Sequence, residues 1–280
     1  MVSSDQRRRQ LAREKFARQQ ARRESARRKA KRRNAIIATS LVVVLAASGG
    51  AVAAGAFTGD GGKEKTDAAA EPSPSPSVKD PCDKPAPGKV KEMSFEKEPK
   101  LTIDKSADYT MSLATTCGDI DIDLKAAAAP HTVNSFNFLV NKGYLDHTKC
   151  HRLTNQGIYV LQCGDPTGTG TGTPGYKIPD ENLKDKSLKD NVYPAGTVAM
   201  ANQYNPQDGK GRDSGGSQFF LVYRDSQLPP DYTPFGTVSK SGMKVLKKIA
   251  DAGATQPDPT TGNTAPNATV VIDKATVRKS

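Results

Sequence analysis

Residues 150–170 read CHRLTNQGIYVLQCGDPTGTG and contain the pattern that decides the fold. The apolar residues on either side of Gly157 predict two short strands joined by a turn at residues 155–157. Cys150 and Cys163 bracket this hairpin, and Arg152 lies just inside the first cysteine. A loop of alternating Gly and Thr follows the second strand. The hairpin therefore carries one permanently charged donor on strands that hold no other charge.

Further strands are predicted on both sides of the hairpin. Upstream, apolar residues alternate with polar ones over residues 109–113 and 120–124, and this period of two marks strands with one buried face. Downstream, four more strand-like runs are Thr197–Ala201, Gln218–Tyr223, Pro234–Val238 and Ala268–Val277. Many short strands with only two helices indicate a mostly β fold built as a closed antiparallel barrel.

Two helices are predicted among these strands. The first spans Pro130–Asn141, with Pro130 in the first turn and Gly143 at the C-terminal stop. The second spans Gly242–Asp251 and ends at Gly253. Apolar residues at helical spacing give each helix one buried face. These are Val133, Phe136, Leu139 and Val140 in the first helix, and Met243, Leu246, Ile249 and Ala250 in the second.

The positive charge of the chain is concentrated at its N-terminus. The net charge is +11, and residues 1–34 alone hold 14 basic residues against three acidic ones. The remaining chain holds 27 basic and 27 acidic residues, so the folded part has no basic excess. Nucleic-acid binding by the folded domain is therefore not expected. Residues 1–34 are predicted to be a basic cytoplasmic tail, with binding to anionic lipid or nucleic acid left open.

Residues 35–57 contain no charge and predict a transmembrane helix, which would reach ~34 Å. The basic residues in front of it favour a cytoplasmic N-terminus. A cleaved signal peptide is the alternative, because residues 51–53 and 54–56 both fit a cleavage site. Residues 58–100, rich in Pro, Ser and Gly, are predicted to be a disordered linker. Both alternatives place residues 58–280 outside the cytoplasm, on the cell membrane or secreted.

All four cysteines follow this apolar segment. An even number of cysteines on the outer side of a membrane favours disulfides. Cys150 and Cys163 are expected to face each other across the hairpin, which leaves Cys82 to pair with Cys117 and join the linker to the domain. The alternative is four buried free thiols, because free cysteine is often buried.

Six sequence motifs occur in an order that resembles cyclophilin-type peptidyl-prolyl cis–trans isomerases. They are Thr132-Val133-x-x-Phe136, His151-Arg152, Gln162-x-Gly164-Asp165-Pro166-Thr167-Gly168-Thr169-Gly170, Met200-Ala201-Asn202, Gly216-Ser217-Gln218-Phe219-Phe220 and Tyr232-Thr233-Pro234-Phe235-Gly236. The resemblance covers residues 101–278 of a domain assigned to 101–280. The cysteines and the long N-terminus resemble exported actinobacterial members. The resemblance implies a closed eight-stranded barrel capped by two helices, with the active groove on its outer face.

The implied reaction is rotation about X-Pro bonds during the folding of exported proteins. Ordinary peptide bonds resist rotation by roughly 18–20 kcal/mol, because resonance keeps them planar. In the twisted state the prolyl nitrogen becomes pyramidal and can accept a hydrogen bond, so a fixed donor aimed at it lowers the barrier. The reaction requires no cofactor, metal or titrating base. Proline-containing polypeptides are the expected partners.

The resemblance assigns a role to each candidate site residue. Arg152 matches the catalytic donor, Gln162 the residue that orients it, and Phe220 the floor of the proline pocket. The matched substrate-binding residues are Tyr159, Val160, Ala201, Asn202, Gln203, Gln218, Leu228 and Tyr232. Without the surrounding motifs, Arg152 would be read as an ordinary surface arginine, and the apolar residues as core.

Several positions depart from the family pattern. Cys150 replaces the usual phenylalanine before His-Arg, and the turn after Arg152 is about two residues longer than usual. Gln227 falls where many members have the tryptophan that holds cyclosporin, and Tyr232 replaces a common histidine. Weak cyclosporin binding is therefore expected. Residues 203–216 are expected to form a long flexible loop that reaches over the groove.

Other functions fit the sequence less well. The Gly/Thr run lacks the Lys-Ser/Thr ending of a phosphate-binding loop. Cys150, His151 and Cys163 lack a fourth zinc ligand, and His151 is expected to be a hydrogen-bonded core histidine. Ser217 lacks the Gly-x-Ser-x-Gly context of a hydrolase. The main alternative to an isomerase is a weakly catalytic or non-catalytic module that binds proline peptides or acts as a chaperone, tethered to the membrane.

Overall fold

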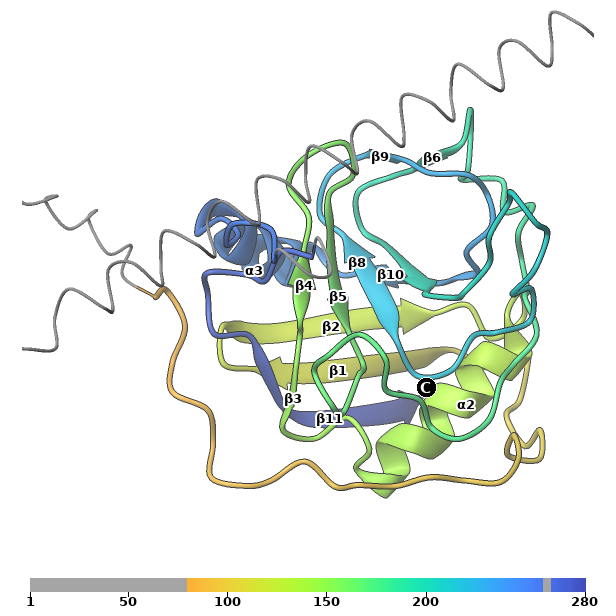
Figure 1. Ribbon diagram of the computed structural model, residues 1–280. Coiled ribbons are helices and arrows are strands. Elements are labelled where there is room, and N and C mark those ends of the chain that lie inside the picture. Colours follow the sequence, from red (N-terminus) through yellow and green to blue (C-terminus); the bar gives the residue numbers. More distant parts are fainter. Residues whose placement is uncertain (1–79, 259–262) are drawn as a thin grey trace, which may run out of the picture. The chain divides into compact units, whose positions relative to one another are not determined.

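The computed structural model describes residues 80–258 and 263–280 (Figure 1). The strands of this part are β1 (Tyr109–Thr115), β2 (Gly118–Leu124), β3 (Thr148–Lys149), β4 (Arg152–Leu153), β5 (Val160–Cys163), β6 (Val192–Tyr193), β7 (Thr197–Met200), β8 (Phe219–Val222), β9 (Ser226–Gln227), β10 (Pro234–Val238) and β11 (Val271–Lys279). The helices are α2 (Pro130–Lys142) and α3 (Lys240–Asp251). The predicted mostly β fold with two helices is therefore confirmed for the described residues.

Nine of the strands form one antiparallel sheet in the order β3-β11-β1-β2-β10-β7-β8-β5-β4, and β6 pairs with β9. The predicted closed barrel of eight strands is wrong in two respects, because the sheet has nine strands and its hydrogen-bonded ladder has two edges. Both edges come from one short segment of the chain. β3 bonds to β11 and β4 bonds to β5, and only Cys150 and His151 separate the two pieces. Between them, the backbone N–H of Cys150 donates to the Val270 carbonyl at 3.0 Å, so this one segment contacts both ends of the sheet.

The alternating strands bury one face, as predicted. Met111 and Leu113 of β1 and Ile120 and Ile122 of β2 are almost fully buried. Gly118 turns the chain between the two strands with a φ of +123°, a value that favours glycine. The β1–β2 hairpin thereby supplies one wall of the main core.

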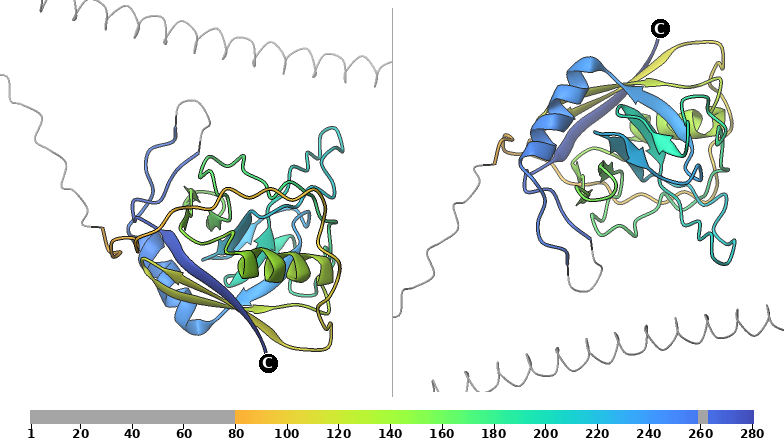
Figure 2. Two further views of the ribbon diagram at one scale, coloured as in Figure 1. Left: turned by 90° about the horizontal axis from the view of Figure 1, so that it is seen from below. Right: turned by 90° about the horizontal axis from the view of Figure 1, so that it is seen from above.

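Each helix packs against the sheet at a different place. Helix α2 lies beside β11 (Figure 2) and α3 packs on β2. The predicted apolar face of α2 is buried in full. In α3, Leu246 and Ile249 are buried, whereas Met243 and Ala250 are only partly buried. Both helices therefore cover the main core through the faces that their sequences indicate.

The ends of α2 are satisfied by specific groups. Ala129 gives no side-chain cap, and the carboxylate of Glu181 instead accepts hydrogen bonds from the backbone N–H groups of His131 (3.0 Å) and Thr132 (2.9 Å). A carboxylate at this end also interacts favourably with the helix dipole. Gly143 ends the helix in the left-handed conformation, as its position predicts.

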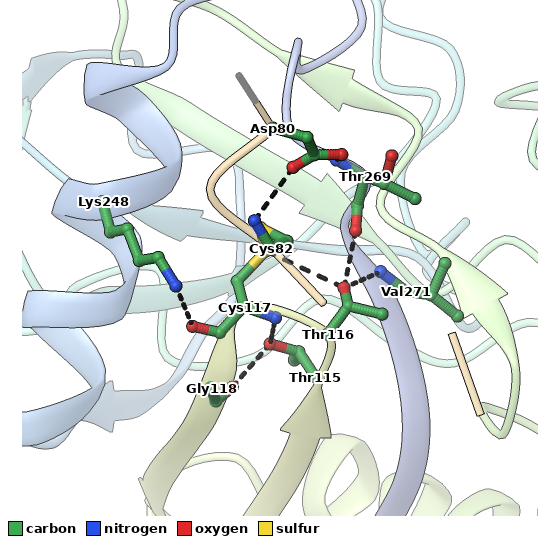
Figure 3. Close-up of a disulfide and its surroundings, with 9 residues drawn as sticks. All are labelled: Asp80, Cys82, Thr115, Thr116, Cys117, Gly118, Lys248, Thr269 and Val271. Atoms are coloured by element: carbon green, nitrogen blue, oxygen red, sulfur yellow. Dashed lines mark hydrogen bonds between the residues drawn. A yellow bond between two sulfur atoms is a disulfide. The ribbon is translucent and has the colours of Figure 1, made fainter. Parts of the chain in front are cut away.

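Residues 80–100 contain no helix or strand, yet they are attached to the domain. Cys82 forms a disulfide with Cys117 (Figure 3). The Asp80 carboxylate accepts hydrogen bonds from the backbone N–H groups of Cys82 and Thr269, both at 3.0 Å. Farther along, the Phe95 ring lies 4.9 Å from that of Phe138. These contacts begin well before residue 101, the predicted start of the domain.

The predictions for the N-terminal region fall mostly outside the described residues. The basic tail at 1–34, the transmembrane helix at 35–57 and the linker up to residue 79 all lie there. Among the helices that the structure describes, none has both the length and the apolar character needed to span a bilayer.

Candidate active site

The predicted catalytic residues come from three adjacent strands. Arg152 on β4 pairs with Gln162 on β5, and Gln162 pairs with Phe220 on β8. Directly opposed residues of antiparallel strands project to the same face of a sheet. The register therefore brings the three side chains together on one face, although they are far apart in the sequence.

A chain of hydrogen bonds holds the Arg152 guanidinium. Its Nη1 donates to Gln162 Oε1 at 3.2 Å, and Gln162 Nε2 donates to Gln218 Oε1 at 2.9 Å. Gln218 Nε2 in turn donates to the backbone carbonyls of Gly170 and Gly172, both at 3.0 Å. The Gly/Thr loop thus fixes the position of the guanidinium through two glutamine side chains.

A notch of about 180 Å³, with an apolar floor and polar groups in its wall, opens beside the guanidinium. It is lined by Arg152, Ile158, Val160, Gln162, Ala201, Asn202, Phe220, Leu228 and Tyr232. Phe220 is 5% exposed, and the Tyr232 ring packs edge-on against it with centroids 5.4 Å apart. We define these nine residues as the notch. A ring of the size of proline fits a cavity of this kind, with the charged donor at its rim.

The notch rests on an apolar cluster separate from the main core. Val160, Ala199 and Phe220 belong to this cluster, whereas the next residues along the chain, Leu161, Met200 and Leu221, belong to the main core. Successive side chains of a strand point to opposite faces. The notch therefore lies on the outer face of the sheet, where the resemblance predicts the groove.

The electrostatics around Arg152 suit a donor that stays available. Burial lowers the pKa of Arg152, and the nearby Tyr232 opposes this shift. Arginine nevertheless keeps its charge in proteins at neutral pH. Within residues 80–258 and 263–280, no carboxylate pairs with Arg152, and Gln162 is its one hydrogen-bond partner. Donor groups of the guanidinium are thus left for a bound ligand.

One predicted wall residue lies elsewhere. Tyr159 points away from the notch and packs against Tyr223 and the Arg224 guanidinium, which lies 3.3 Å from its ring centroid. Ile158 takes its place in the wall. The reason is the alternation of side chains along an extended segment, since Ile158 and Val160 are two residues apart and share a face. The same alternation was visible in the sequence, but the longer turn obscured the alignment.

A second cavity, of about 200 Å³, lies beside the notch and shares three residues with it: Gln162, Ala201 and Asn202. Two of the predicted binding residues, Gln203 and Gln218, line this cavity and not the notch. Its remaining wall consists of the Gly/Thr loop with Thr173, of Lys177, and of Ser214, Gly216 and Ser217. The two hollows together make a continuous groove across the outer face.

The Gly/Thr loop encloses a carboxylate of its own chain. Asp165 is fully buried and accepts hydrogen bonds from the backbone N–H groups of Thr167, Thr169 and Gly170 at 2.6–3.1 Å. Burial raises the pKa of Asp165, but hydrogen bonds from Thr167 and the Gly backbone outweigh it and lower the pKa. These N–H groups are therefore already occupied and do not form a phosphate cradle.

The expectation of a hydrogen-bonded His151 is wrong. Both of its ring nitrogens are buried and have no hydrogen-bond partner in the part of the chain that the structure describes. Burial lowers the pKa of His151, and the nearby Asp165 opposes the shift. The ring faces Gly170, which has no side chain to offer a partner. His151 therefore packs as a neutral ring behind Arg152.

Both predicted disulfides are confirmed. Cys150 and Cys163 are bonded, with Cα atoms 4.0 Å apart, and Cys82 is bonded to Cys117. No free cysteine occurs, since all four lie within the described residues. The Cys150–Cys163 bond joins the chain just before β4 to the last residue of β5, directly beside the Arg152–Gln162 pair.

The fold and the site define a mostly β domain whose outer face carries an apolar notch with a fixed cationic donor. The family model of the cyclophilin type peptidyl-prolyl cis-trans isomerases matches residues 110–277. The chain therefore belongs to this family. The described residues contain no group of three His, Cys, Asp or Glu side chains arranged to hold a metal ion.

Several curated proteins are similar to this chain. A probable peptidyl-prolyl cis-trans isomerase B of Mycobacterium leprae is 49% identical over 52% of this chain and 50% of its own length. A protein of the same description from Mycobacterium tuberculosis (strain ATCC 25618 / H37Rv) is 44% identical over 60% of this chain and 55% of its own length. A peptidyl-prolyl cis-trans isomerase of Dictyostelium discoideum is 38% identical over 51% of this chain and 85% of its own length. The chain spans about half the length of the two mycobacterial relatives.

Proposed function

We propose that this protein catalyses the cis–trans isomerisation of X-Pro bonds. The observation that carries the proposal is the position of Arg152, which Gln162 holds at the rim of a notch floored by Phe220. Relatives named as isomerases of this type, one of them covered over 85% of its length, support the same activity.

In the proposed mechanism the proline ring enters the notch and packs on Phe220. The flanking carbonyl then rotates toward the solvent side while the ring stays fixed. As the bond twists, the prolyl nitrogen loses conjugation, and the Arg152 guanidinium donates a hydrogen bond to its lone pair. The planar isomers lack this acceptor, so the interaction favours the twisted state selectively. Gln162 prevents the guanidinium from reorienting between turnovers.

The substrates that we propose are segments of exported proteins. Both disulfides of the domain favour an oxidising compartment, because such bonds rarely persist in a reducing cytoplasm. Residues 35–57 would anchor the domain to the outer side of the cell membrane, or release it if they are cleaved. Mass spectrometry of the mature N-terminus from the membrane fraction tests this part, and a start after residue 53 or 56 would contradict a retained anchor.

Weak binding of cyclosporin is part of the same proposal. Gln227 stands where many family members have tryptophan, and its Nε2 donates to the carbonyl of Asp190 at 2.8 Å. An amide tied to the backbone gives a large apolar ring less area to pack on than an indole gives. Inhibition at cyclosporin concentrations typical of tryptophan-containing members would contradict this inference.

A proline-limited peptide assay on Arg152→Ala tests the activity. Loss of the donor should lower kcat/KM by roughly 10²–10³-fold, as for other single donors to a transition state. Arg224→Ala is the matched control, because it removes the same side chain from a position outside the notch. Equal rates for Arg152→Ala and wild type would refute the role of Arg152. Retained peptide binding without turnover in the wild type would instead support the binding module.

A further inference from the structure

The loop of residues 203–216 is pinned against the groove by one arginine. Arg212 forms an ion pair with Asp231 through Nη2 and approaches Asp180 through Nη1 at 3.5 Å. Its guanidinium also stacks on the Tyr204 ring, 3.5 Å from the centroid. The side chain thus ties two positions of the loop to two acidic residues outside it. These contacts hold the loop at its two ends, at residues 204 and 212.

The same two acidic residues hold a wall of the notch. Asn202 Nδ2 donates to the Asp231 carbonyl at 2.7 Å and to Asp180 Oδ1 at 3.4 Å. Asn202 lines both the notch and the second cavity, and Tyr232, the residue after Asp231, lines the notch. Arg212 touches neither hollow itself. Its contacts nevertheless fix the residues that form the boundary between them.

The rest of the loop is fastened to the second cavity. The backbone N–H of Gln203 donates to Ser214 Oγ at 2.8 Å, and the N–H of Asp180 donates to Asp213 Oδ1 at 2.8 Å. Gln203 and Ser214 both line the second cavity. Loop residues on both sides of Arg212 therefore contact the second cavity or the residues beside it. Arg212 adds the ion pairs that hold the loop in this position.

Removal of Arg212 would leave two carboxylates without a counter-charge. The Asp180 side chain is 8% exposed and that of Asp231 is 17% exposed. Among the described residues, Arg212 is the one cation that pairs with either of them. Poorly hydrated like charges repel each other and gain by separating. Separation of these two would displace Asn202 and Tyr232.

We propose that Arg212 is a positioning residue that sets the affinity of the groove for the polypeptide around the proline. The inference rests on the proposed function, but it concerns substrate binding and not the chemical step. Arg212 does not line the notch, so its loss should weaken substrate binding and leave the twisted-state interaction with Arg152 intact. Such a change raises KM and leaves kcat unchanged.

Kinetics and binding of Arg212→Ala, Arg212→Lys and Asp231→Asn test the proposal, with Arg224→Ala as the control. Loss of a charge-assisted contact that shapes the groove should raise KM for a proline tetrapeptide about tenfold in Arg212→Ala. Lysine keeps the charge but lacks the planar guanidinium that stacks on Tyr204. The KM of Arg212→Lys should therefore lie between those of Arg212→Ala and the wild type. Asp231→Asn removes the repulsion between the two carboxylates and leaves Arg212 on Asp180, so it should raise KM less than Arg212→Ala. For the same reason, the double variant Arg212→Ala with Asp231→Asn should recover part of the loss seen in Arg212→Ala.

An unchanged KM in Arg212→Ala overturns the proposal, as does an equal rise in Arg224→Ala. A fall of kcat in Arg212→Ala with KM unaltered also overturns it, because the residue would then act on the chemical step. If the wild type shows no turnover, the proposed function fails, and calorimetric binding of the same tetrapeptide decides the inference separately. About tenfold weaker binding by Arg212→Ala then supports the positioning role, and equal binding excludes it.

Discussion

The Cys150–Cys163 disulfide offers a sharp test of how stability and activity are divided in this domain. The two cysteines are 13 residues apart, and both are almost fully buried. In the chain-entropy description, a loop of this length contributes about 3 kcal/mol to the free energy of unfolding. Replacement of both cysteines by alanine should therefore lower the Tm by roughly 6–12 °C, at about 2–4 °C per kcal/mol for a domain of this size.

The same replacement should also affect activity. β4 has only two residues and lies at the edge of the sheet, where it pairs with β5 and where Leu153 also bonds to Thr264. Without the disulfide, the Arg152–Gln162 pair would be held by this short ladder and by the glutamine relay. A small misplacement of a catalytic donor is costly, and we expect kcat/KM to fall about tenfold.

The Cys82–Cys117 pair is the matched control. Its cysteines are 35 residues apart, so its removal should cost about 4 kcal/mol, slightly more than the shorter loop. The bond joins the N-terminal segment to the turn between β1 and β2, away from the residues that line the notch. The double alanine variant at these positions should therefore lose more Tm but keep its kcat/KM.

Calorimetric unfolding and the proline-limited assay, run on both double variants, give the two quantities. We expect the variant without the Cys82–Cys117 bond to lose more Tm, and the variant without the Cys150–Cys163 bond to lose more activity. Full activity after removal of the Cys150–Cys163 bond would refute the reasoning, because the hairpin would then hold Arg152 without it. So would a larger loss of activity in the Cys82–Cys117 variant.

Two further predictions follow from individual contacts. Asp185 accepts a hydrogen bond from Lys125 Nζ at 2.7 Å. Burial raises the pKa of the Asp185 carboxyl, but this hydrogen bond and those from Ser187 and Asn182 outweigh burial and lower the pKa. The resulting stability is present above the unfolded pKa of about 3.9 and is lost as pH falls below it, so Asp185→Asn should destabilise by about 1–3 kcal/mol at pH 7 and much less at pH 2. A deficit of equal size in chemical unfolding at both pH values would contradict this, and Asp251→Asn, at an exposed pair, should change little. In the notch, Ile158→Ala should lower kcat/KM about tenfold through lost packing, whereas Tyr159→Ala should leave it near wild type. A larger fall of kcat/KM in Tyr159→Ala than in Ile158→Ala would contradict this and would place Tyr159 in the wall of the notch.

The sequence by itself determined the local structure and the strongest features of the site. Alternation of apolar and polar residues located β1 and β2 closely, a strand-like run located β10, and proline and glycine marked the ends of α2. The hairpin pattern paired the cysteines correctly, and the family resemblance joined Gln162 to Arg152. These inferences succeeded because each depends on residues close together in the chain or on a period that the backbone itself imposes.

Only the tertiary structure decided how distant segments complete the site. Asp180, Asn202, Arg212 and Asp231 come from three connections, after β5, β7 and β9, and no periodicity in the sequence indicates that they meet. The edges of the sheet at β3 and β4, and the exchange of Tyr159 for Ile158 in the notch, were likewise hidden. The physical reason is that such contacts depend on how loops pack once the sheet has formed. Local patterning fixes which face of a strand is buried, but it carries no information about which loop lies over the other face.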